Sequence, residues 1–520
     1  MTPNSASDSI EAILNDGVGV TWGSQARSAA TQSTRELGAT VATTMGPFGR
    51  DKLVVNNGGH VHVTNDSVTI LRNLHLTDPV GRTVLEVANS QIFNAGDGTT
   101  TALVLTGELL RRALELCERG VHPTSVVAGY QLAAEAAQRR LLEIANRYDL
   151  TDRAIALDVA KTTLAGSSAG YERDHLAELA VSAVERATSG YDVDLDKIRF
   201  RTAGGRDMAA SRLVTGAMLE AVPERRPTEP ASESVELLAF DGEIMPPETD
   251  RSLVADAGTL AAGTFEDTER RWVSATSERL IESGVDLLVC SGTVDDAVAD
   301  RLRRAGIDCL TTVSGADMRF LRRMVARDLL RAIEEIESDG TVPVSLEYDW
   351  EAGRTTLTTD DAAAITVLLY SQSEAQRDQL ESKMSDAVEV VAQVAYDGRV
   401  LPGGGAPELE MARAVDAVAR DRDDRSQLAA DAFGEALISI PRILLQNAGL
   451  DPIDRLHAQQ AAHHDGEWFA AVDLETGAVI DARERGIRET LTVKRHAISV
   501  SLDAACMLVR IDGILESEQD

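Results

Sequence analysis

Lysine, aromatic side chains and paired cysteines are all scarce in this sequence of 520 residues. Aromatic residues make up 4% of the chain, and the 51 basic residues are nearly all arginine. The 84 acidic residues give a net charge of −33, and they are spread along the whole chain. Nucleic-acid binding needs a basic stripe, and none is visible, so the composition argues against a nucleic-acid partner.

Dispersed acid with little lysine is typical of proteins from salt-accumulating archaea. Molar salt screens the repulsion between like charges that such a composition would otherwise cause. We therefore expect a halophilic archaeon as the source. A merely acidic cytosolic protein is the alternative.

The four cysteines are far apart and form no CxxC pair, so neither a zinc site nor a disulfide framework is expected. No apolar run approaches the ~20 residues that cross a bilayer. The polar segment 1–10 lacks a secretion signal. These absences predict a cytoplasmic protein that spans no membrane.

Standard nucleotide motifs are missing as well. No GxxxxGK[ST] sequence occurs, and the segment 17–22 fails GxGxxG because Trp22 stands at the third glycine position. Residues 166–170 do fit GxSxG, the pattern of a hydrolase with Ser168 as nucleophile. That mechanism requires a strand before the motif, whereas residues 157–164 have a helical pattern, so we disfavour this hydrolase.

The two ends of the chain are predicted to be helical. Apolar residues recur at helical spacing through most of the first 150 residues, around one hairpin at 52–63 with a Gly-rich turn. Helices return from about 374 to about 460, followed by a β-rich stretch at 470–490. A last helix is expected at 493–515.

The middle of the chain has a different pattern. Residues 285–290 are a buried-strand run, 294–305 are helical and 307–312 start a second strand. This strand–helix–strand order predicts an α/β domain. Helical ends bracket it, so we expect a discontinuous outer domain with the middle inserted.

The segment Asn94–Thr101 is the sharpest candidate site, because it opens the helix predicted at 99–118. Two glycines permit a tight turn and close approach of a ligand, and the helix start presents unpaired N–H groups. Such a start suits phosphate, and Asp97 would suit a Mg²⁺ ion bound to that phosphate. The alternative is a plain N-cap made by the Asp or a Thr.

Three further features could contribute to a phosphate-binding site. Pro402–Gly405 is a second Gly-rich entry to a helix, or else a mobile linker. Asp66 follows the hairpin, and Asp386 lies in a helical segment. Two such carboxylates converging on a phosphate could orient and deprotonate water, although a lone Asp is usually solvated or capping.

Taken together, these motifs resemble the group II chaperonins, the archaeal thermosome and its cytosolic eukaryotic relatives. The resemblance covers nearly the whole chain and includes the family's G-D-G-T-T-T sequence. Seven blocks occur in the family's order: Thr44–Lys52, Val63–Leu71, Gly96–Thr101, Val121–Thr124, Pro402–Ala406, Gly449–Asp454 and Val493–Asp512.

The resemblance implies a multi-domain α+β protein: a mostly helical equatorial domain, a small intermediate domain and an α/β apical domain with a helical protrusion. The implied boundaries are 1–148 and 398–520 for the equatorial ATP-binding domain, 149–203 and 355–397 for the intermediate domain, and 204–354 for the apical substrate-binding domain. The protrusion would lie at about 243–276.

The implied activity is ATP hydrolysis that closes a double-ring chamber around unfolded protein. The double ring would be built from like subunits, as a homo- or hetero-oligomer.

Site residues follow from the same resemblance. Asp97 would hold Mg²⁺ on the ATP phosphates, and Asp66 and Asp386 would act on the attacking water. The residues expected at the nucleotide are Gly46, Pro47, Gly98, Thr99, Thr100, Gly404, Gly405 and Glu489, the last on the ribose.

Several positions depart from the family pattern. Phe48 replaces a Lys, Ser67 replaces a Gly, and Ser167 replaces a Lys that reports on the terminal phosphate in relatives. The loss of that Lys puts the coupling of chamber closure in doubt. Two alternatives therefore remain beside an active chaperonin ATPase: a divergent ring subunit that binds ATP but hydrolyses it poorly, and an unrelated hydrolase using Ser168.

Overall fold

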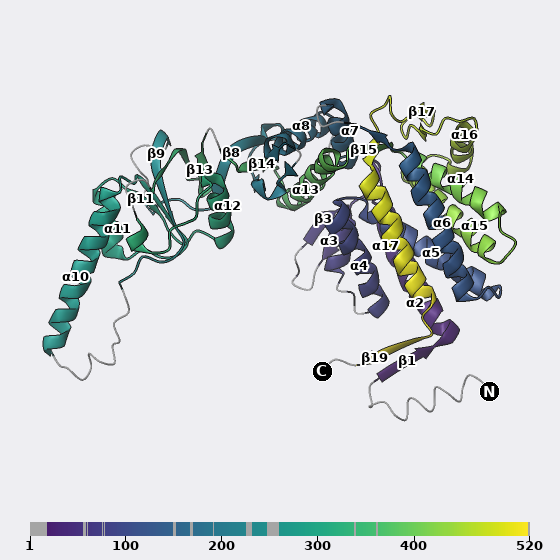
Figure 1. The fold of residues 1–520 in the computed structure, drawn as a ribbon, viewed down its shortest axis with the longest axis horizontal. Helices are drawn as coiled ribbons and strands as arrows, with labels where there is room; N and C mark the ends of the chain where they lie inside the picture. Colours follow the sequence, from purple (N-terminus) through teal and green to yellow (C-terminus); the bar gives the residue numbers. More distant parts are fainter. Residues whose placement is uncertain are drawn as a thin grey trace. The chain divides into compact units, whose positions relative to one another are not determined.

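The structure is a computed structural model, and it separates the chain into two compact units. It describes residues 18–55, 59, 61–74, 76, 78–148, 152–166, 170–190, 192–224, 231–246, 259–336, 340–359 and 362–517. One unit combines Met1–Val184 with Ser371–Asp520, and the other is Glu185–Tyr370 (Figure 1). The predicted insertion of a middle segment into a discontinuous outer part is confirmed. The finer division into three domains stays a prediction.

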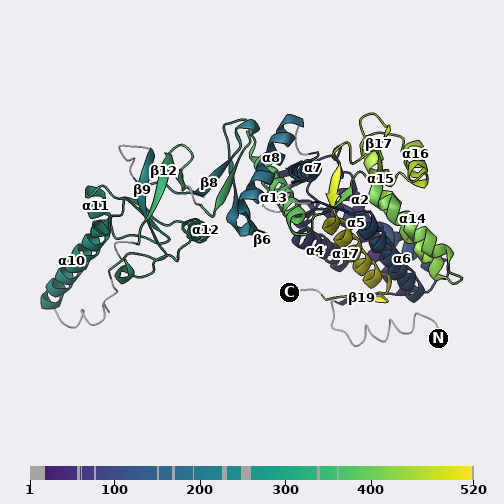
Figure 2. The same ribbon diagram turned by 45° about the horizontal axis from the view of Figure 1, so that its top comes forward.

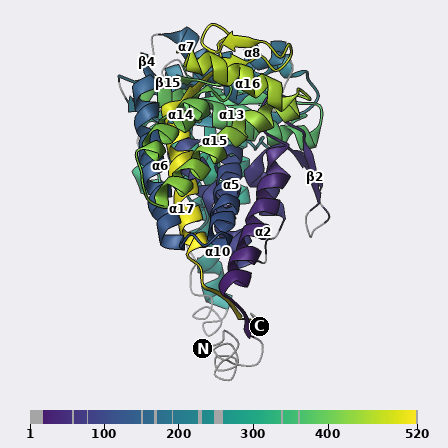
Figure 3. The same cartoon turned by 90° about the vertical axis from the view of Figure 1, so that its right-hand side faces the viewer.

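Long helices form the core of the discontinuous unit. These are α2 (Gly23–Ala42), α4 (Pro79–Ala95), α5 (Thr99–Glu118), α6 (Pro123–Ile144), α14 (Ala406–Arg420), α15 (Ser426–Asn447) and α17 (Leu491–Val509). Figure 3 shows α5 between α2 and α17, and α5 contacts both helices. The rings of Tyr130 and Phe433 meet edge to face at 5.7 Å inside this core, between α6 and α15.

Local sequence sets several helix starts. Asp78 accepts hydrogen bonds from the first turn of α4 and is followed by Pro79. Asp451 and Pro452 begin α16 (Pro452–His464) in the same way. A capping carboxylate followed by proline satisfies free N–H groups and presets the helical φ angle, so these starts follow from the sequence.

Shorter elements complete this unit. The helices are α3 (Ser67–Asn73), α7 (Arg153–Thr163), α8 (Gly170–Ala187) and α13 (Glu374–Tyr396). The last three residues of α8 belong to the second unit. The predicted hairpin is confirmed as β2 (Lys52–Val55) and β3 (Val61–Thr64). A three-stranded sheet joins β18 (Arg488–Thr490), β15 (Arg399–Pro402) and β4 (Asn146–Arg147), and β16 (Ala470–Val472) pairs with β17 (Val479–Asp481).

The expected last helix at 493–515 is too long by several residues. Helix α17 ends at Val509, and Gly513–Ser517 forms strand β19. This strand pairs antiparallel with β1 (Val18–Trp22), as Figure 1 shows near the two chain ends. Sequence periodicity missed the pairing because its two strands come from opposite ends of the chain.

The hydrolase interpretation fails on local structure. Residues 153–163, before the GxSxG sequence, are helix α7 and not a strand. A nucleophile elbow needs a strand-to-helix turn. Ser168 itself lies outside the described residues.

The inserted unit is built on an eight-stranded mixed sheet of order β11-β10-β9-β12-β13-β8-β14-β7. Its strands are β7 (Ile198–Ala203), β8 (Arg212–Leu219), β9 (Ala231–Phe240), β10 (Leu287–Cys290), β11 (Asp308–Leu310), β12 (Val342–Asp349), β13 (Arg354–Thr358) and β14 (Ile365–Tyr370). Strands β9, β10 and β11 are parallel, which confirms the predicted α/β pattern.

Helices flank this sheet: α10 (Thr259–Glu282), α11 (Asp296–Arg304) and α12 (Gly315–Val325). Figure 2 shows α10 beside α11. Minor elements are β5 (Thr188–Ser189), β6 (Asp192–Val193) and 3₁₀ turns at Leu195–Lys197, Met208–Ala210 and Ile333–Glu335.

Helix α10 includes the end of the predicted protrusion at 243–276, of which residues 247–258 lie outside the described ranges. No helix among the described residues is long and apolar enough to span a bilayer.

Candidate functional site

Two left-handed glycines shape the turn that carries Asp97. Gly96 ends α4 with φ +64°, and Gly98 begins α5 with φ +80°. A Cβ at Gly98 would lie 2.7 Å from Val493 Cγ1, and one at Gly96 would lie 2.5 Å from the Glu389 carboxylate. Both the backbone conformation and the close neighbours therefore require glycine.

The carboxylate of Asp97 does not cap α5. Its Oδ1 accepts a hydrogen bond from the adjacent N–H of Gly98 over 2.6 Å, and its Oδ2 accepts one from the Thr163 hydroxyl over 3.1 Å. No side chain caps this helix, whose N-cap residue is Gly98. The plain N-cap interpretation is therefore wrong, and the first turn of α5 keeps its N–H groups for a ligand.

Gln91 fixes the Asp97 turn from behind, and sequence analysis missed it. Its fully buried amide donates to the Asp97 carbonyl over 2.7 Å and to the Val493 carbonyl over 3.2 Å. The Gln91 carbonyl oxygen also lies 2.9 Å from His496 Nδ1. A glutamine in the middle of a helix carries no local signal for such a role, since two of its partners, Val493 and His496, lie on the distant helix α17.

The structure brings Asp66 and Asp386 to the same place as Asp97. Asp66 is buried and caps α3, accepting from the Thr69 N–H over 2.9 Å. Asp386, on α13, is 7% exposed. Burial raises the pKa of Asp386 well above its ordinary range. The Lys383 ammonium opposes this rise, whereas the negative charges of Asp97, Asp66 and Glu389 add to it. The structure confirms that Asp66 caps a helix, and its action on the attacking water stays a prediction.

A lysine that sequence analysis did not single out lies in the same cluster. Lys383 Nζ is 3.8 Å from Asp386 Oδ2. Burial by itself would lower the pKa of Lys383, but attraction to Asp386, Asp97 and Asp66 outweighs it and raises this pKa. The cluster therefore combines the three aspartates with one ammonium group, and the nearby Glu389 adds a fourth carboxylate.

The turn after α2 is linked to the Asp66 segment through the loop after α7, where the Gly166 carbonyl accepts a hydrogen bond from Asn65 Nδ2. Gly46 has φ +78°, and a Cβ there would lie 2.5 Å from Leu444 Cδ2 on α15. The loop after α7 closes on the same turn, because a Cβ at Gly166 would lie 2.9 Å from the Gly46 carbonyl oxygen. Pro47 follows Gly46 in this turn, and Gly166 also lies near it.

The threonines at the start of α5 differ in exposure. Thr99 is 7% exposed, and Thr100 is half-buried with its hydroxyl on the hydroxyl of Ser67. A glycine at position 67 would leave Thr100 without this partner, so Ser67 adds a contact at the start of α5.

Gly404 and Gly405 form a fixed turn and not a mobile linker. Both have left-handed backbones, and Gly405 is buried. A Cβ at Gly405 would lie 2.6 Å from Pro441 Cβ, three residues before Leu444 on α15. Since residues three apart share one face of a helix, the Gly46 and Gly405 turns pack on the same face of α15.

Glu489 is held on β18, opposite Leu401 of β15. Its carboxylate pairs with Lys494, whose ammonium also lies 2.7 Å from Glu408 Oε1. A Cβ at Gly403 would lie 3.2 Å from Glu489 Oε1. The sheet thus brings the predicted ribose-binding acid beside the glycine turn expected at the nucleoside.

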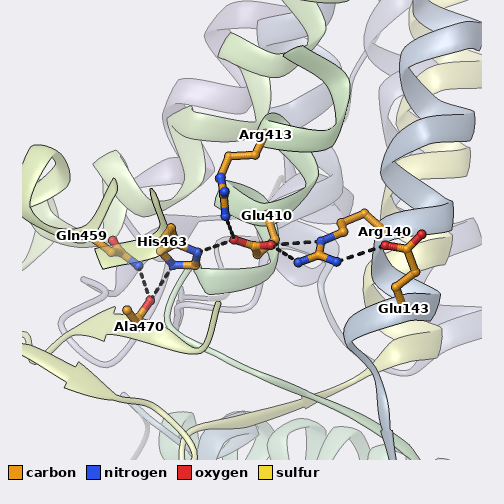
Figure 4. Close-up of polar contacts among 7 residues, drawn as sticks. All are labelled: Arg140, Glu143, Glu410, Arg413, Gln459, His463 and Ala470. Carbon is orange, nitrogen blue, oxygen red and sulfur yellow. Dashed lines mark hydrogen bonds and ion pairs between the residues drawn. The ribbon is translucent and has the colours of Figure 1, made fainter. Parts of the chain in front are cut away.

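A buried ionic network supports this end of the site (Figure 4). Glu410, on α14, accepts hydrogen bonds from Arg413 over 2.7 Å and from His463 Nδ1 over 2.8 Å, and it pairs with Arg140. Burial would raise the pKa of Glu410, but these hydrogen bonds lower it to about 2. The carboxylate is therefore ionised at neutral pH.

The same network anchors strand β16. His463 Nε2 lies 2.9 Å from the Ala470 carbonyl oxygen, and Gln459 donates to the same oxygen over 3.0 Å. The next residue, Ala471, is the neighbour that a Cβ at Gly404 would meet at 2.9 Å. The network therefore fixes a wall of the glycine turn.

Within the described residues, neither a cluster of metal ligands nor the two surface depressions mark the predicted site. Within the described ranges, no three His, Cys, Asp or Glu side chains are grouped to hold a metal ion by themselves. Two surface depressions, of about 460 and 300 Å³, are lined by none of the predicted site residues. The site is recognised by its residues and turns, not by the size of a cavity.

Comparison with known proteins points to one protein family over nearly the whole chain. Residues 37–519 match the model of the TCP-1/cpn60 chaperonin family. A thermosome subunit of Methanopyrus kandleri is 36% identical over 518 residues, 98% of this chain and 95% of the relative. Thermosome subunit 2 of Haloferax volcanii is 34% identical over 493 residues, 93% and 88% of the two chains. Thermosome subunit alpha of Archaeoglobus fulgidus is 34% identical over 517 residues, 97% and 94%.

Proposed function

This chain belongs to the TCP-1/cpn60 chaperonin family, and on that premise we propose that it is a ring subunit that hydrolyses ATP to fold captured proteins. The observation that carries the proposal is the convergence of Asp66, Asp97 and Asp386. They come from the turn after β3, the α4–α5 turn and α13, and they meet beside an uncapped helix start. The third alternative, a serine hydrolase, has no such support.

ATP and Mg²⁺ fit the residues at hand. The left-handed turn at Gly98 and the N–H groups of Thr99 and Thr100 suit phosphate oxygens, with Gly46 and Pro47 on the other side of the phosphates. Asp97 offers one carboxylate, and Mg²⁺ commonly takes one or two carboxylates together with phosphate oxygens and water. When bound, the ion would supply positive charge to the phosphates.

The other end of the site suits the nucleoside. Gly404 and Gly405 allow close approach of a flat ligand to the backbone, since no Cβ stands there. Glu489, on the neighbouring strand, would accept hydrogen bonds from the ribose. Its pairing with Lys494 holds the carboxylate in place.

Asp386 and Asp66 would act on the attacking water. A carboxylate whose pKa is raised above its ordinary range binds a proton more strongly, which suits a general base. The presence of all three aspartates in one cluster favours an active ATPase over the alternative subunit that only binds ATP. Residues 149–203 and 355–397 would form the intermediate domain that carries Asp386.

An exposed apolar face suits contact with neighbouring subunits. Leu53 pairs with Val63 and Val55 with Val61 across the β2–β3 hairpin, and these side chains are 67%, 36%, 56% and 51% exposed in that order. Cross-strand apolar pairs left in solvent mark an interaction surface. We propose that a second, like subunit covers this face in a ring that works in the cytoplasm.

The proposal is tested on the purified chain in molar KCl. Native mass, ATP hydrolysis and refolding of a denatured test protein are measured together. A ring that hydrolyses ATP and raises the refolding yield only with ATP supports the proposal. A monomer without ATPase activity overturns it, and a ring that binds ATP without turnover supports the binding-only alternative.

A further inference from the structure

Lys383 lies on the face of α13 that points toward the carboxylate cluster. It is three residues before Asp386, and the two side chains are 17% and 10% exposed. One turn earlier, Gln379 donates from Nε2 to Asn65 Oδ1 over 3.1 Å, and Asn65 precedes Asp66. Residues at i, i+4 and i+7 share one helix face, so Gln379, Lys383 and Asp386 all face the turn of Asp66.

The Lys383–Asp386 pair has hydrogen-bonding capacity that the described residues do not use. Its separation of 3.8 Å is that of an ion pair and is too long for a hydrogen bond. Within the described part of the chain, neither the ammonium nor the Asp386 carboxylate makes a hydrogen bond. Burying charged groups in this way is costly unless a polar ligand completes the site.

Lys494 shows the contrast within the same unit. Its ammonium lies 2.7 Å from Glu408, contacts Glu489 as well, and belongs to a side chain 7% exposed. The Lys494 ammonium is paired with two carboxylates, so this lysine needs no ligand to balance its charge. Lys383 reaches no carboxylate at hydrogen-bond distance, so its donors remain available.

The negative charges gathered at the site would repel one another unless a cation balanced them. Three aspartates are gathered there, and nucleotide phosphates would add further negative charge. The resemblance to the chaperonins implies a lysine at position 167, where this chain has Ser167. Lys161, on the nearby helix α7, does not replace it, because its ammonium pairs with Asp174 at 3.1 Å.

We propose that Lys383 binds the terminal phosphate group of the bound nucleoside triphosphate and takes the place of the lysine missing at Ser167. This inference rests on the proposed function. It adds that the phosphate-binding cation and the carboxylate acting on water belong to one helix, α13. Any movement of α13 would therefore carry both groups to or from the phosphate together.

Equilibrium binding separates this role from a structural one. Titration calorimetry measures the affinities of ATP and ADP, each with Mg²⁺, for wild type, Lys383→Met and Lys383→Arg. Hydrogen bonds to charged groups contribute enough for a loss of about tenfold or more. Lys383→Met should lose at least that factor for ATP and little for ADP, and Lys383→Arg should restore most of the ATP affinity.

Lys161→Met is the matched control, since it removes a lysine of α7 that is ion-paired at the surface. It should leave both affinities unchanged. Equal losses for ATP and ADP in Lys383→Met, or no loss, would overturn the role of Lys383 and leave the proposed function intact. A wild type that binds neither nucleotide would overturn both.

A second measurement needs no variant. The chain has few lysines, so acetylation by an amine-reactive reagent can be followed at each one by mass spectrometry. The non-hydrolysable triphosphate AMP-PNP should protect Lys383 more strongly than ADP does. Equal protection by the two nucleotides would count against terminal-phosphate binding, even if Lys383→Met failed to fold.

Discussion

Thr163 donates a hydrogen bond from its hydroxyl to Asp97 Oδ2 over 3.1 Å, linking the end of α7 to the turn between α4 and α5. The other carboxylate oxygen is held by the Gly98 N–H. Asp97 is therefore oriented from both sides before any ligand binds, as a metal ligand must be if binding is to be tight.

The first prediction concerns Asp97. Asp97→Asn should abolish the Mg²⁺ dependence of ATP binding while the fold is kept, because the amide replaces the charge with little change in shape. Thr163→Val, which removes only the orienting hydroxyl, should weaken Mg²⁺-dependent binding by roughly tenfold. Titration of ATP with and without Mg²⁺ measures both effects. Unchanged ATP affinity in Asp97→Asn would remove this residue from the metal site.

The second prediction concerns Asp386. Asp386→Asn should bind ATP about as well as wild type and hydrolyse it at least roughly a hundredfold more slowly, the range for loss of a general base. Single-turnover hydrolysis beside equilibrium binding separates the two quantities. If Asp386 only solvates its helix, turnover will be nearly normal.

A variant that tests Asp66 in hydrolysis must also keep its capping of α3. Asp66→Asn keeps the cap on α3, because Asn caps as well as Asp, whereas Asp66→Ala would also cost about 1 kcal/mol in stability. Asp66→Asn should slow hydrolysis much as Asp386→Asn does. The double variant should be little worse than either single one, since groups that act as a unit are not additive.

The third prediction concerns the glycine turn. Gly405→Ala places a methyl group 2.6 Å from Pro441 Cβ in a residue with φ +83°, so both strain and overpacking apply. A loss of about 2–4 kcal/mol in unfolding free energy is expected. Gly449→Ala is the control, with φ +72° but open space around the new methyl, and should lose only about 1 kcal/mol. Equal losses would show that close approach to α15 is unimportant.

The fourth prediction concerns pH. The folded-state pKa of Glu410 is lowered to about 2, below its ordinary 4.5. Its ionic network therefore stabilises the fold above about pH 4.5, and this contribution disappears as the pH falls toward 2. At pH 7, Glu410→Gln should cost on the order of 3 kcal/mol, and the difference from wild type should shrink as acid is added.

Glu143→Gln is the matched control for Glu410. Glu143 also pairs with Arg140, but its side chain is 54% exposed. An exposed ion pair contributes at most about 1 kcal/mol, so this variant should be nearly as stable as wild type. Urea unfolding followed by circular dichroism at several pH values measures both variants. A Glu410→Gln effect that does not change with pH would contradict the assigned ionisation.

The fifth prediction concerns salt. With a net charge of −33 on each chain, repulsion between subunits grows as the screening length rises from ~3 Å at 1 M to ~10 Å at 0.1 M salt. Light scattering over a KCl series should show rings dissociating as salt is lowered. A ring intact at 0.1 M would argue against a halophilic source, and a monomer at every concentration would argue against a ring.

Local sequence determined most of the helices and turns of this protein. Asp78–Pro79 and Asp451–Pro452 predict helix starts because capping and a preset φ act within a few residues. Gly96 and Gly98 likewise marked the Asp97 turn. Such features can be read from neighbouring residues alone, and the seven family blocks added the order of the sites along the chain.

Only the tertiary structure decided which distant groups meet. Gln393 of α13 donates to the Ala95 carbonyl across 298 residues of sequence, and this packing brings Asp386 to Asp97. The same packing gives Lys383 its place among the aspartates, and the pairing of β1 with β19 joins the two ends of the first unit. Sequence spacing carries no record of these contacts, because they depend on how helices pack and not on the conformation of adjacent residues.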